Sequence, residues 1–245
     1  MYNTLKNIAK ALIPNKFLIK NELLFRNVFS FFYIGKNHEC QICNNTLKAF
    51  VPLNENDLIC PCCGSLSRNR RLWALIKNDA NINGKILHFS PSRSLFRKLK
   101  QAYKSNYFSS DFESEFIADY KFDITQINQE NHTFDLIICY HILEHILDDQ
   151  KAMNELYRVL KPGGTIYIQT PFKTGEIYED ASIVLPEERE KHFGQNDHVR
   201  IYSVKGLTNR LENSGFKVNV KTYNKEQDDF YFGLKSPETV LIASK

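Results

Sequence analysis

The sequence predicts an α/β fold, a doubly wound and mostly parallel sheet, preceded by a small cysteine-rich segment. From residue 85 onward, apolar strand-like segments alternate with amphipathic helix-like segments, which is typical of such a sheet. One of these segments, "FDLIICY" at 134–140, is continuously apolar, as a central strand covered on both faces must be. Five of the six cysteines lie between positions 40 and 63, and they predict a separate small unit.

Residues 1–36 form a basic amphipathic arm, predicted to fold as two short helices. Lysines and arginines predominate among its charged residues, and Glu22 is its single acid. The net charge of the whole chain is only +4, so no nucleic-acid partner is expected. Charges interrupt every apolar run, which argues against a secretory signal or a membrane span. The arm either packs on the main domain or makes peripheral contact with anionic lipid or a partner protein. We expect a cytoplasmic location, with membrane contact through the arm as the alternative.

Two Cys-x-x-Cys pairs, Cys40/Cys43 and Cys60/Cys63, predict a structural zinc ribbon over residues 37–70. In each pair a tight turn points both sulfurs at one place, and two such pairs can wrap one tetrahedral Zn²⁺. Four thiolates leave no position open to water, so the metal would hold the segment together without doing chemistry. A catalytic zinc or a redox pair is the alternative. The cluster favours a metal over disulfides because the compartment is expected to be reducing.

The helix after the ribbon, "SRNRRLWALI", begins with three arginines that cap the ribbon, face an anionic ligand or are simply solvated: Arg68, Arg70 and Arg71. The α/β body is predicted over residues 71–245, with 172–203 as an insertion. Its strands are expected at 85–90, 106–111, 118–125, 134–141, 165–172, 216–223 and 238–245, and its helices at 94–103, 149–164 and 204–215. The link between the second and third strands is too short for a crossover helix, so a turn is expected there.

The stretch "FDLIICYHILEHI", followed by "AMNELYRVLKPGG" and an apolar strand, resembles the class I S-adenosylmethionine-dependent methyltransferases. The leading "CPCCGS" with "RNRR", and "GQNDHVRIY" at 194–202, are similar to a bacterial subgroup with an N-terminal zinc ribbon. The resemblance covers roughly residues 40–245. It implies a Rossmann-like seven-stranded sheet, S-adenosyl-L-methionine as cofactor, and O- or N-methylation of a small molecule or glycan component. A catalytically inactive binding or scaffold protein with the same fold is the alternative.

In open α/β sheets the ligand lies over the carboxyl ends of the strands, at the switch point of the sheet. The family usually has a glycine-rich turn after the first strand, but here the turn is Ser90-Pro91-Ser92. This turn can still end the strand. Ser92 can then cap the following helix, so that the helix N–H groups face the methionine carboxylate.

The other cofactor candidates end the next three strands. Asp111 is placed to accept hydrogen bonds from the ribose hydroxyls, Asp123 to accept one from the adenine amino group, and Ile124 to pack on the ring. Tyr140 and His141 end the fourth strand beneath the reactive methyl, where an aromatic face is favourable to a sulfonium. The alternative for Asp111 is a helix cap or a turn residue.

"HILEH" at 141–145 also matches the inverted zinc-protease signature, which places two histidines one helical turn apart. Here His141 finishes a predicted strand, so we expect no zinc-peptidase site. We expect instead that Glu144 and His145 start a turn that lines the cofactor pocket, or that they form hydrogen bonds with the backbone.

The insertion at 172–203 is predicted to form the acceptor side of the site, because long loops in compact domains tend to carry function. His198 and His192 are the candidate general bases, with His198 preferred, and Arg200 is a candidate clamp for an anionic substrate group. Two further residues are candidates for orienting the acceptor: Gln195 and Asp197. The alternative for each residue is a structural hydrogen bond that docks the insertion.

Overall fold

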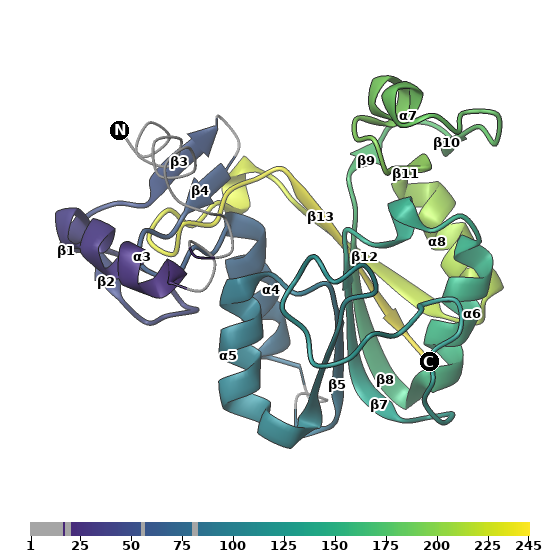
Figure 1. The fold of residues 1–245 in the computed structure, drawn as a ribbon, viewed down its shortest axis with the longest axis horizontal. Coiled ribbons are helices and arrows are strands. Elements are labelled where there is room, and N and C mark those ends of the chain that lie inside the picture. The colour runs from purple at the N-terminus through teal and green to yellow at the C-terminus, as the bar shows by residue number, and fades with distance from the viewer. Residues whose placement is uncertain (1–16, 18–20, 55–56, 80–82) are drawn as a thin grey trace. The chain divides into compact units, whose positions relative to one another are not determined.

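The computed structural model describes residues 17, 21–54, 57–79 and 83–245 (Figure 1). Contacts divide the chain into two compact units. The first unit takes in residues 1–78, 92–98 and 223–238, and the second takes in 79–91, 99–222 and 239–245. The predicted arm and ribbon fall in the first unit. Most of the arm, residues 1–16 and 18–20, lies outside the described residues.

The described part of the arm forms the helix α3, Glu22–Ser30, followed by the short 3₁₀ helix η1, Phe31–Tyr33. Glu22 accepts hydrogen bonds from Arg26 and Arg93, both at 2.8 Å, and from Arg97 at 3.2 Å. Burial raises the pKa of Glu22, but Arg26 and Arg93 outweigh burial and leave this pKa below its usual value. This carboxylate therefore ties α3 to the first residues of the helix α5, Arg93–Tyr103, which belong to the same unit.

Two antiparallel hairpins follow, as a ribbon requires. The first pairs β1 with β2 and the second pairs β3 with β4. Their bounds are Ile34–Glu39, Thr46–Leu47, Val51–Asn54 and Asp57–Ile59. The helix α4, Ser67–Ile76, comes next.

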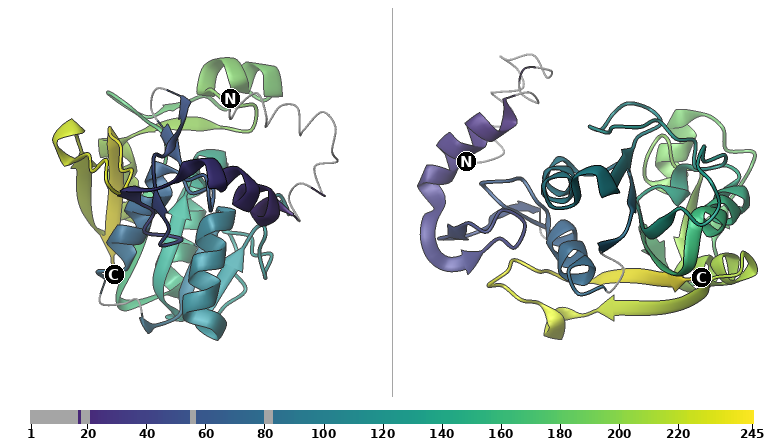
Figure 2. Two further views of the ribbon diagram at one scale, coloured as in Figure 1. Left: turned by 90° about the vertical axis from the view of Figure 1, so that its left-hand side faces the viewer. Right: turned by 90° about the horizontal axis from the view of Figure 1, so that it is seen from below.

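Among the described residues, the main sheet has six strands in the order β12-β13-β8-β7-β5-β6. Their bounds are β5 Ile86–Phe89, β6 Tyr107–Ser110, β7 Phe134–Tyr140, β8 Leu160–Gln169, β12 Lys217–Tyr223 and β13 Glu238–Ser244. The strands β6, β5, β7 and β8 are parallel, and β13 runs antiparallel to β8. Figure 2 shows β12 and β13 side by side. The strand order reverses between β5 and β7, and in open α/β sheets ligands typically bind at the carboxyl ends of the strands at such a point.

The core explains why β7 is apolar throughout. Leu87, Ile137, Ile166 and Leu241 belong to one cluster with buried residues of the helices α6, Asp149–Val159, and α8, Val204–Asn213. Side chains on the opposite face of the strand, such as those of Leu136 and Ile138, are also fully buried. Both faces of β7 are thus covered, as predicted. Within the described residues, every helix is too short or too polar to cross a lipid bilayer.

The prediction of a third strand at 118–125 is wrong, so the sheet has six described strands and not seven. Tyr120 makes a single parallel bridge to Ser110. The N–H groups of Asp119 and Tyr120 donate to the carbonyl of Ser109 at 3.2 and 2.9 Å. Two serine hydroxyls of β6 also accept N–H groups of this segment, so regular strand pairing stops here. Ser109 Oγ accepts from Asp119 at 2.9 Å and Ser110 Oγ accepts from Phe122 at 2.8 Å.

The predicted helix at 149–164 ends earlier than expected. The helix α6 stops at Val159, and Leu160 already has extended φ and ψ of −75° and 136°. Lys161 precedes Pro162, and the residue before a proline is pushed away from helical conformation. The strand β8 therefore begins within "LKPGG", and not after it.

The insertion at 172–203 is a small structured element. The strands β9, Phe172–Lys173, and β10, Tyr178–Glu179, flank β11, Arg200–Ser203, in a three-stranded sheet of the described residues. The helix α7, Pro186–Phe193, lies between β10 and β11 in sequence and beside them in space (Figures 1 and 2). Pro186 starts this helix at a position where proline is tolerated, and Gly194 ends it with φ of 87°.

Candidate functional site

The four predicted zinc ligands converge in the first unit. Cys40 Sγ lies 3.7 Å from Cys63 Sγ, and Cys43 Sγ lies 3.8 Å from Cys60 Sγ. All four sulfurs lie within 4.8 Å of one another. A zinc tetrahedron with Zn–S bonds of about 2.3 Å has edges of about 3.8 Å, so this set of sulfurs fits one zinc ion.

Both cysteine pairs have the same backbone turn. The N–H of Asn44 donates to the carbonyl of Cys40 at 2.7 Å, and the N–H of Gly64 donates to that of Cys60 at 3.0 Å. Asn44 and Gly64 have positive φ of 58° and 78°. Asparagine and glycine tolerate this left-handed conformation best, so both turns are favoured by local sequence. Cys62 lies outside the group of four.

Arg70 of α4 is completely buried beside the ribbon. Its guanidinium donates to four carbonyls, those of Leu58, Ser65, Phe232 and Gly233. Burial lowers the pKa of Arg70, and the nearby cysteines oppose this. Arg71 is also buried and pairs with Glu238 at 2.8 Å. The solvated interpretation is therefore wrong for Arg70 and Arg71.

In the second unit, the glycine-free turn after β5 is built on Ser90. This residue has φ of 42°, in the left-handed region where the family's glycine would be free of strain. Its N–H donates to the carbonyl of Ser110 at 2.7 Å, and its hydroxyl donates to Asp111 Oδ1 at 2.7 Å. Pro91 is buried. The two hydrogen bonds join the ends of β5 and β6 and hold the turn without glycine.

Ser92 belongs to the first unit and stands before α5. Its carbonyl accepts from the N–H of Phe96 at 2.8 Å, and its hydroxyl lies 3.4 Å from that of Ser94. This hydrogen bond to the carbonyl places Ser92 at the start of α5, as predicted. Its role toward a cofactor stays a prediction.

Asp111 is buried and already accepts several hydrogen bonds. Besides the Ser90 hydroxyl, the N–H groups of Glu115 and Phe116 donate to its Oδ2 at 2.6 and 3.0 Å. It also lines a shallow pocket with Phe116, Ala118 and Tyr120. A carboxylate beside aromatic rings suits the ribose and base of an adenosine group, so the residues present fit the cofactor.

The residues predicted at the end of the third strand serve the local fold. Asp123 Oδ1 accepts from the N–H and the hydroxyl of Thr125, both at 2.8 Å, and so closes a turn. Ile124 is 5% exposed and belongs to the core cluster. Because the strand itself is absent, their contacts with adenine stay a prediction.

At the end of β7, Tyr140 is buried and His141 has φ of 55°. The N–H of His141 donates to Gln169 of β8 at 2.7 Å, and its Nδ1 lies 3.3 Å from Glu144 Oε1. The 3₁₀ helix η4, Leu143–His145, follows. The long helix that the zinc-protease signature needs does not form at 141–145, which confirms that part of the prediction.

Glu144 is only 1% exposed. Burial raises its pKa, but His141 and, more weakly, His145 leave this pKa below its usual value. Two of the imidazoles near this carboxylate, those of His141 and His145, are close to it in the sequence, whereas His198 comes from the insertion. The burial of Glu144 was not expected from the sequence.

The two candidate general bases lie in different surroundings. His192 of α7 is exposed, and its Nδ1 lies 2.7 Å from the hydroxyl of Tyr178. His198 is 4% exposed, and its Nδ1 donates to the carbonyl of Phe193 at 3.1 Å. Its ring packs edge-on against His145, with ring centroids 4.6 Å apart. Asp197 Oδ2 lies 3.0 Å from His145 Nδ1.

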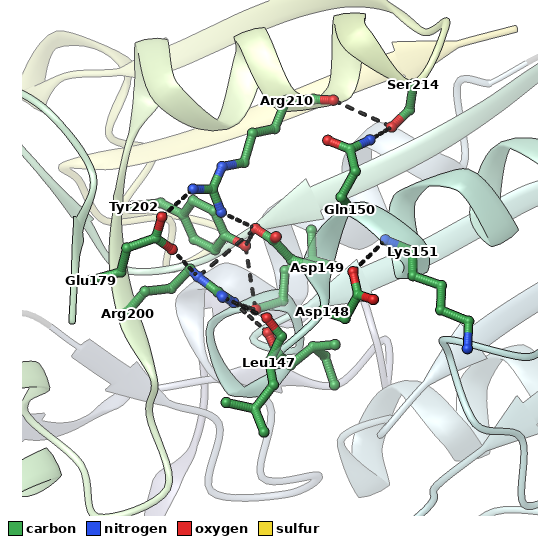
Figure 3. Close-up of polar contacts among 12 residues, drawn as sticks. Leu147, Asp148, Asp149, Gln150, Lys151, Glu179, Arg200, Tyr202, Arg210 and Ser214 are labelled. Carbon is green, nitrogen blue, oxygen red and sulfur yellow. Dashed lines mark hydrogen bonds and ion pairs between the residues drawn. The ribbon is translucent and has the colours of Figure 1, made fainter. Parts of the chain in front are cut away.

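Arg200, the candidate substrate clamp, is the centre of an internal polar network (Figure 3). It is 6% exposed and donates to Glu179 at 2.8 Å through Nε. Its other N–H groups donate to the carbonyls of Leu143, Ile146 and Leu147. These contacts favour the alternative interpretation, in which Arg200 docks the insertion onto the segment after β7.

Two further charged side chains join this network and were missed by sequence reasoning. Arg210 of α8 bridges Glu179 and Asp149, and the hydroxyl of Tyr202 donates to Asp149 at 2.5 Å (Figure 3). Asp149 stands at the first position of α6, where an acid is a common helix-terminus residue. The sequence around Asp149 does not show whether it only stabilises the start of α6 or also links α6 to α8 and to the insertion.

A family profile described as "Methyltransferase domain" matches residues 59–220, more than half of the chain. The chain belongs to this methyltransferase family, and its predicted resemblance to the class of S-adenosylmethionine-dependent methyltransferases is confirmed. A probable S-adenosylmethionine-dependent methyltransferase from Mycolicibacterium smegmatis is 25% identical over 96 residues, which are 39% of this chain and 34% of that protein. The match thus spans about a third of that curated relative's length.

Two solved structures share the fold at low sequence identity. A SAM-dependent methyltransferase from Archaeoglobus fulgidus has a TM-score of 0.53 at 16% identity, covering 73% of this chain and 92% of that one. A second, from Mesorhizobium loti, has a TM-score of 0.51 at 15% identity, covering 71% and 97%. The predicted α/β methyltransferase fold is thereby confirmed.

Proposed function

We propose that the chain binds S-adenosyl-L-methionine over the carboxyl ends of β5, β6 and β7 and transfers its methyl group to a small molecule or glycan component. The observation that carries this proposal is the hydrogen bond between Ser90, after β5, and Asp111, after β6, beside the point between β5 and β7 where the strand order reverses. When bound, the cofactor supplies a methyl group already activated by its sulfonium. The protein then has to hold it and align the acceptor.

Three of the predicted cofactor residues have a defined task in this proposal: Asp111, Tyr140 and His141. Asp111 keeps lone pairs for ribose hydroxyls beyond those used by Ser90 and by the loop after β6. Its existing hydrogen bonds fix the carboxylate before the ligand arrives, which reduces the entropic cost of binding. Tyr140 and His141 end the central strand, where the methyl group is expected. The insertion at 172–203 bears the acceptor side.

We also propose that the cysteine group of the ribbon holds one structural Zn²⁺. The sulfur distances and the paired turns support this role. Since four thiolates complete the coordination of zinc, no methyl-transfer step is assigned to it.

Calorimetric titration with S-adenosylmethionine and with its demethylated product tests cofactor binding. The unaltered chain is expected to bind both, and Asp111→Asn should weaken binding by roughly tenfold through loss of charge-assisted hydrogen bonds. Asp148→Asn is a matched control, because Asp148 caps α6 through the N–H of Lys151 and lies outside the proposed site. If the unaltered chain binds neither compound, the inactive scaffold interpretation replaces this proposal.

For the arm, we propose peripheral contact with an anionic membrane surface at a cytoplasmic location. The described part of the arm exposes large apolar side chains, namely Leu24, Val28, Phe31 and Phe32. Apolar side chains next to a basic segment are typical of interfacial helices. Co-sedimentation with vesicles containing an anionic lipid, compared with neutral vesicles, tests this contact. Equal binding to both, or to neither, would contradict it.

A further inference from the structure

We infer that Glu144, His145 and His198 form a second metal site, which takes a divalent transition metal ion. Their ligand atoms lie within 4.8 Å of one another, although His198 belongs to the insertion and the other two residues to η4. Two imidazoles and one carboxylate are a ligand set that suits ions such as Mn²⁺, Fe²⁺, Co²⁺ and Zn²⁺. The cluster lies directly after β7, at the carboxyl edge of the sheet.

The hydrogen bonds of the two imidazoles fix which nitrogen is available to a metal. The Nδ1 of His198 lies against the carbonyl of Phe193, and the Nδ1 of His145 lies against the carboxylate of Asp197. Carbonyls and carboxylates only accept, so both Nδ1 atoms must carry the proton. In the neutral form of each ring, Nε2 then keeps its lone pair. Metal-binding histidines typically have this arrangement, with the far nitrogen donating to a carboxylate or a backbone carbonyl.

The state of Glu144 is the second, independent observation. Both of its carboxylate oxygens are buried and accept no hydrogen bond from the described residues. The polar atom that faces it is His141 Nδ1 at 3.3 Å, and Nε2 of that histidine is likewise buried without a hydrogen bond. A buried carboxylate without hydrogen bonds costs free energy, which a cation bound between Glu144 and the two imidazoles would offset.

The insertion also holds the ligands in place. The N–H of Val199 donates to the carbonyl of Glu144 at 2.9 Å. Arg200, two residues after His198, donates to the carbonyls of Leu143, Ile146 and Leu147, which surround both ligands of η4. The three ligands are therefore fixed relative to one another before a metal binds, as a preorganised site requires.

Three protein ligands leave coordination positions for the acceptor. Resting on the proposed function, this narrows the acceptor to a molecule that presents a hydroxyl group to the metal. A metal ion favours the deprotonated form of a bound hydroxyl, whose proton leaves to water. The oxygen then bonds to the methyl carbon while the carbon–sulfur bond breaks and its electron pair stays on sulfur. The site thus favours O-methylation over N-methylation.

Cobalt binding to the full-length chain, loaded beforehand with zinc at the cysteine group, tests the site. We expect one Co²⁺ per chain by calorimetry. The proton NMR spectrum should then contain two solvent-exchangeable, paramagnetically shifted signals from the Nδ1–H groups of His145 and His198. The wild-type spectrum alone can decide the matter, so the test does not depend on how well a variant folds. Absence of cobalt binding beyond the zinc-loaded ribbon overturns the proposal.

Variants test the assignment residue by residue. His198→Gln and Glu144→Gln should each weaken cobalt binding by more than about 100-fold, and Asp197→Asn by about tenfold, as loss of a ligand and of an outer hydrogen bond predict. His132→Gln is the matched control, since His132 is an exposed histidine in the turn before β7, and it should leave cobalt affinity unchanged. Unchanged affinity in His198→Gln, with unchanged melting temperature, overturns the assignment.

Titration with S-adenosylmethionine in the same samples separates this inference from the proposed function. Cofactor binding without cobalt binding contradicts the metal site and leaves the methyltransferase proposal standing. Cobalt binding without cofactor binding supports the metal site and contradicts the role in methyl transfer. If both bind, methylation of a catechol should depend on added metal, whereas metal-independent turnover of an amine would contradict the role given to the metal.

Discussion

The protein has two groups of potential metal ligands, and they are assembled in opposite ways. The cysteine group comes from two short turns with the same backbone hydrogen bonds. The group of Glu144, His145 and His198 joins a 3₁₀ turn to a segment far along the chain. A local turn places its ligands wherever the turn forms. The second group depends on docking of the insertion, so it exists only in the folded unit.

Both regions contain a buried arginine that binds backbone carbonyls. Arg70 connects the ribbon and α4 to Phe232 and Gly233, and Arg200 connects the insertion to the segment after β7. In each case one guanidinium donates hydrogen bonds to carbonyls of separate segments, which do not belong to one shared helix or sheet. The planar group with five donors can do this, whereas a lysine cannot.

The largest expected effect is loss of the ribbon metal. Cys60→Ser should release zinc and unfold the first unit, because a structural zinc site contributes on the order of 10 kcal/mol to folding of a small domain. Zinc content and thermal unfolding of the full-length chain measure the effect. Cys62→Ser is the control, since Cys62 lies outside the group of four. Zinc loss in the control, or zinc retention in Cys60→Ser, would show that the ligands are assigned wrongly.

The next effect tests whether Arg200 is structural. Arg200→Met should lower the free energy of unfolding by about 3 kcal/mol, because Glu179 and several carbonyls lose a buried donor. Urea unfolding measures the change. Arg189→Met, which removes one long contact of 3.4 Å, should change stability far less. A variant with normal stability and a raised KM for the acceptor would instead restore the substrate-clamp interpretation.

A smaller effect concerns pH and the buried His88 of β5. Burial lowers the pKa of His88 to about 3, although its Nδ1 shares a hydrogen bond of 3.0 Å with Tyr107. The unfolded chain binds a proton at this histidine near pH 6.5, and the folded chain does not until near pH 3. Stability is therefore lost as the pH falls through this window, by about 1.5 kcal/mol between pH 6.5 and 5.

Urea unfolding at these two pH values, in the unaltered chain and in His88→Gln, isolates the contribution of this histidine. The variant should lose that part of the pH dependence. An identical pH dependence in both proteins would mean that the pKa of His88 is the same in the folded and the unfolded chain.

The smallest effect concerns the glycine-free turn. Ser90→Gly removes the strain of φ at 42° and also the hydrogen bond to Asp111, two terms of about 1 kcal/mol each that nearly cancel. Ser90→Ala keeps the strain and loses the bond, so it should be destabilised by about 1 kcal/mol. Chemical unfolding of both variants makes the comparison. Equal loss of stability in both would show that the backbone conformation at Ser90 is not strained.

The parts of the molecule that the sequence predicted well are those with a local cause. The two cysteine turns, the central strand at 134–140 and the helix at 204–213 follow from residue spacing and apolar pattern, and the structure confirms them. The prediction of a third strand at 118–125 was wrong because the sequence does not show that the hydroxyls of Ser109 and Ser110 accept N–H groups of this segment, which makes a single bridge to β6.

Sequence alone thus determined the class of fold, the composition of the ribbon site and the edge of the sheet at which we propose that the cofactor binds. These depend on contacts between neighbours in the chain or on a hydrophobic pattern with a fixed period. Tertiary structure decided the partners of Arg70 and Arg200, the burial of Glu144 and the meeting of His145 with His198. Polar side chains carry no periodic signal, and they find their partners only when packing brings distant segments together.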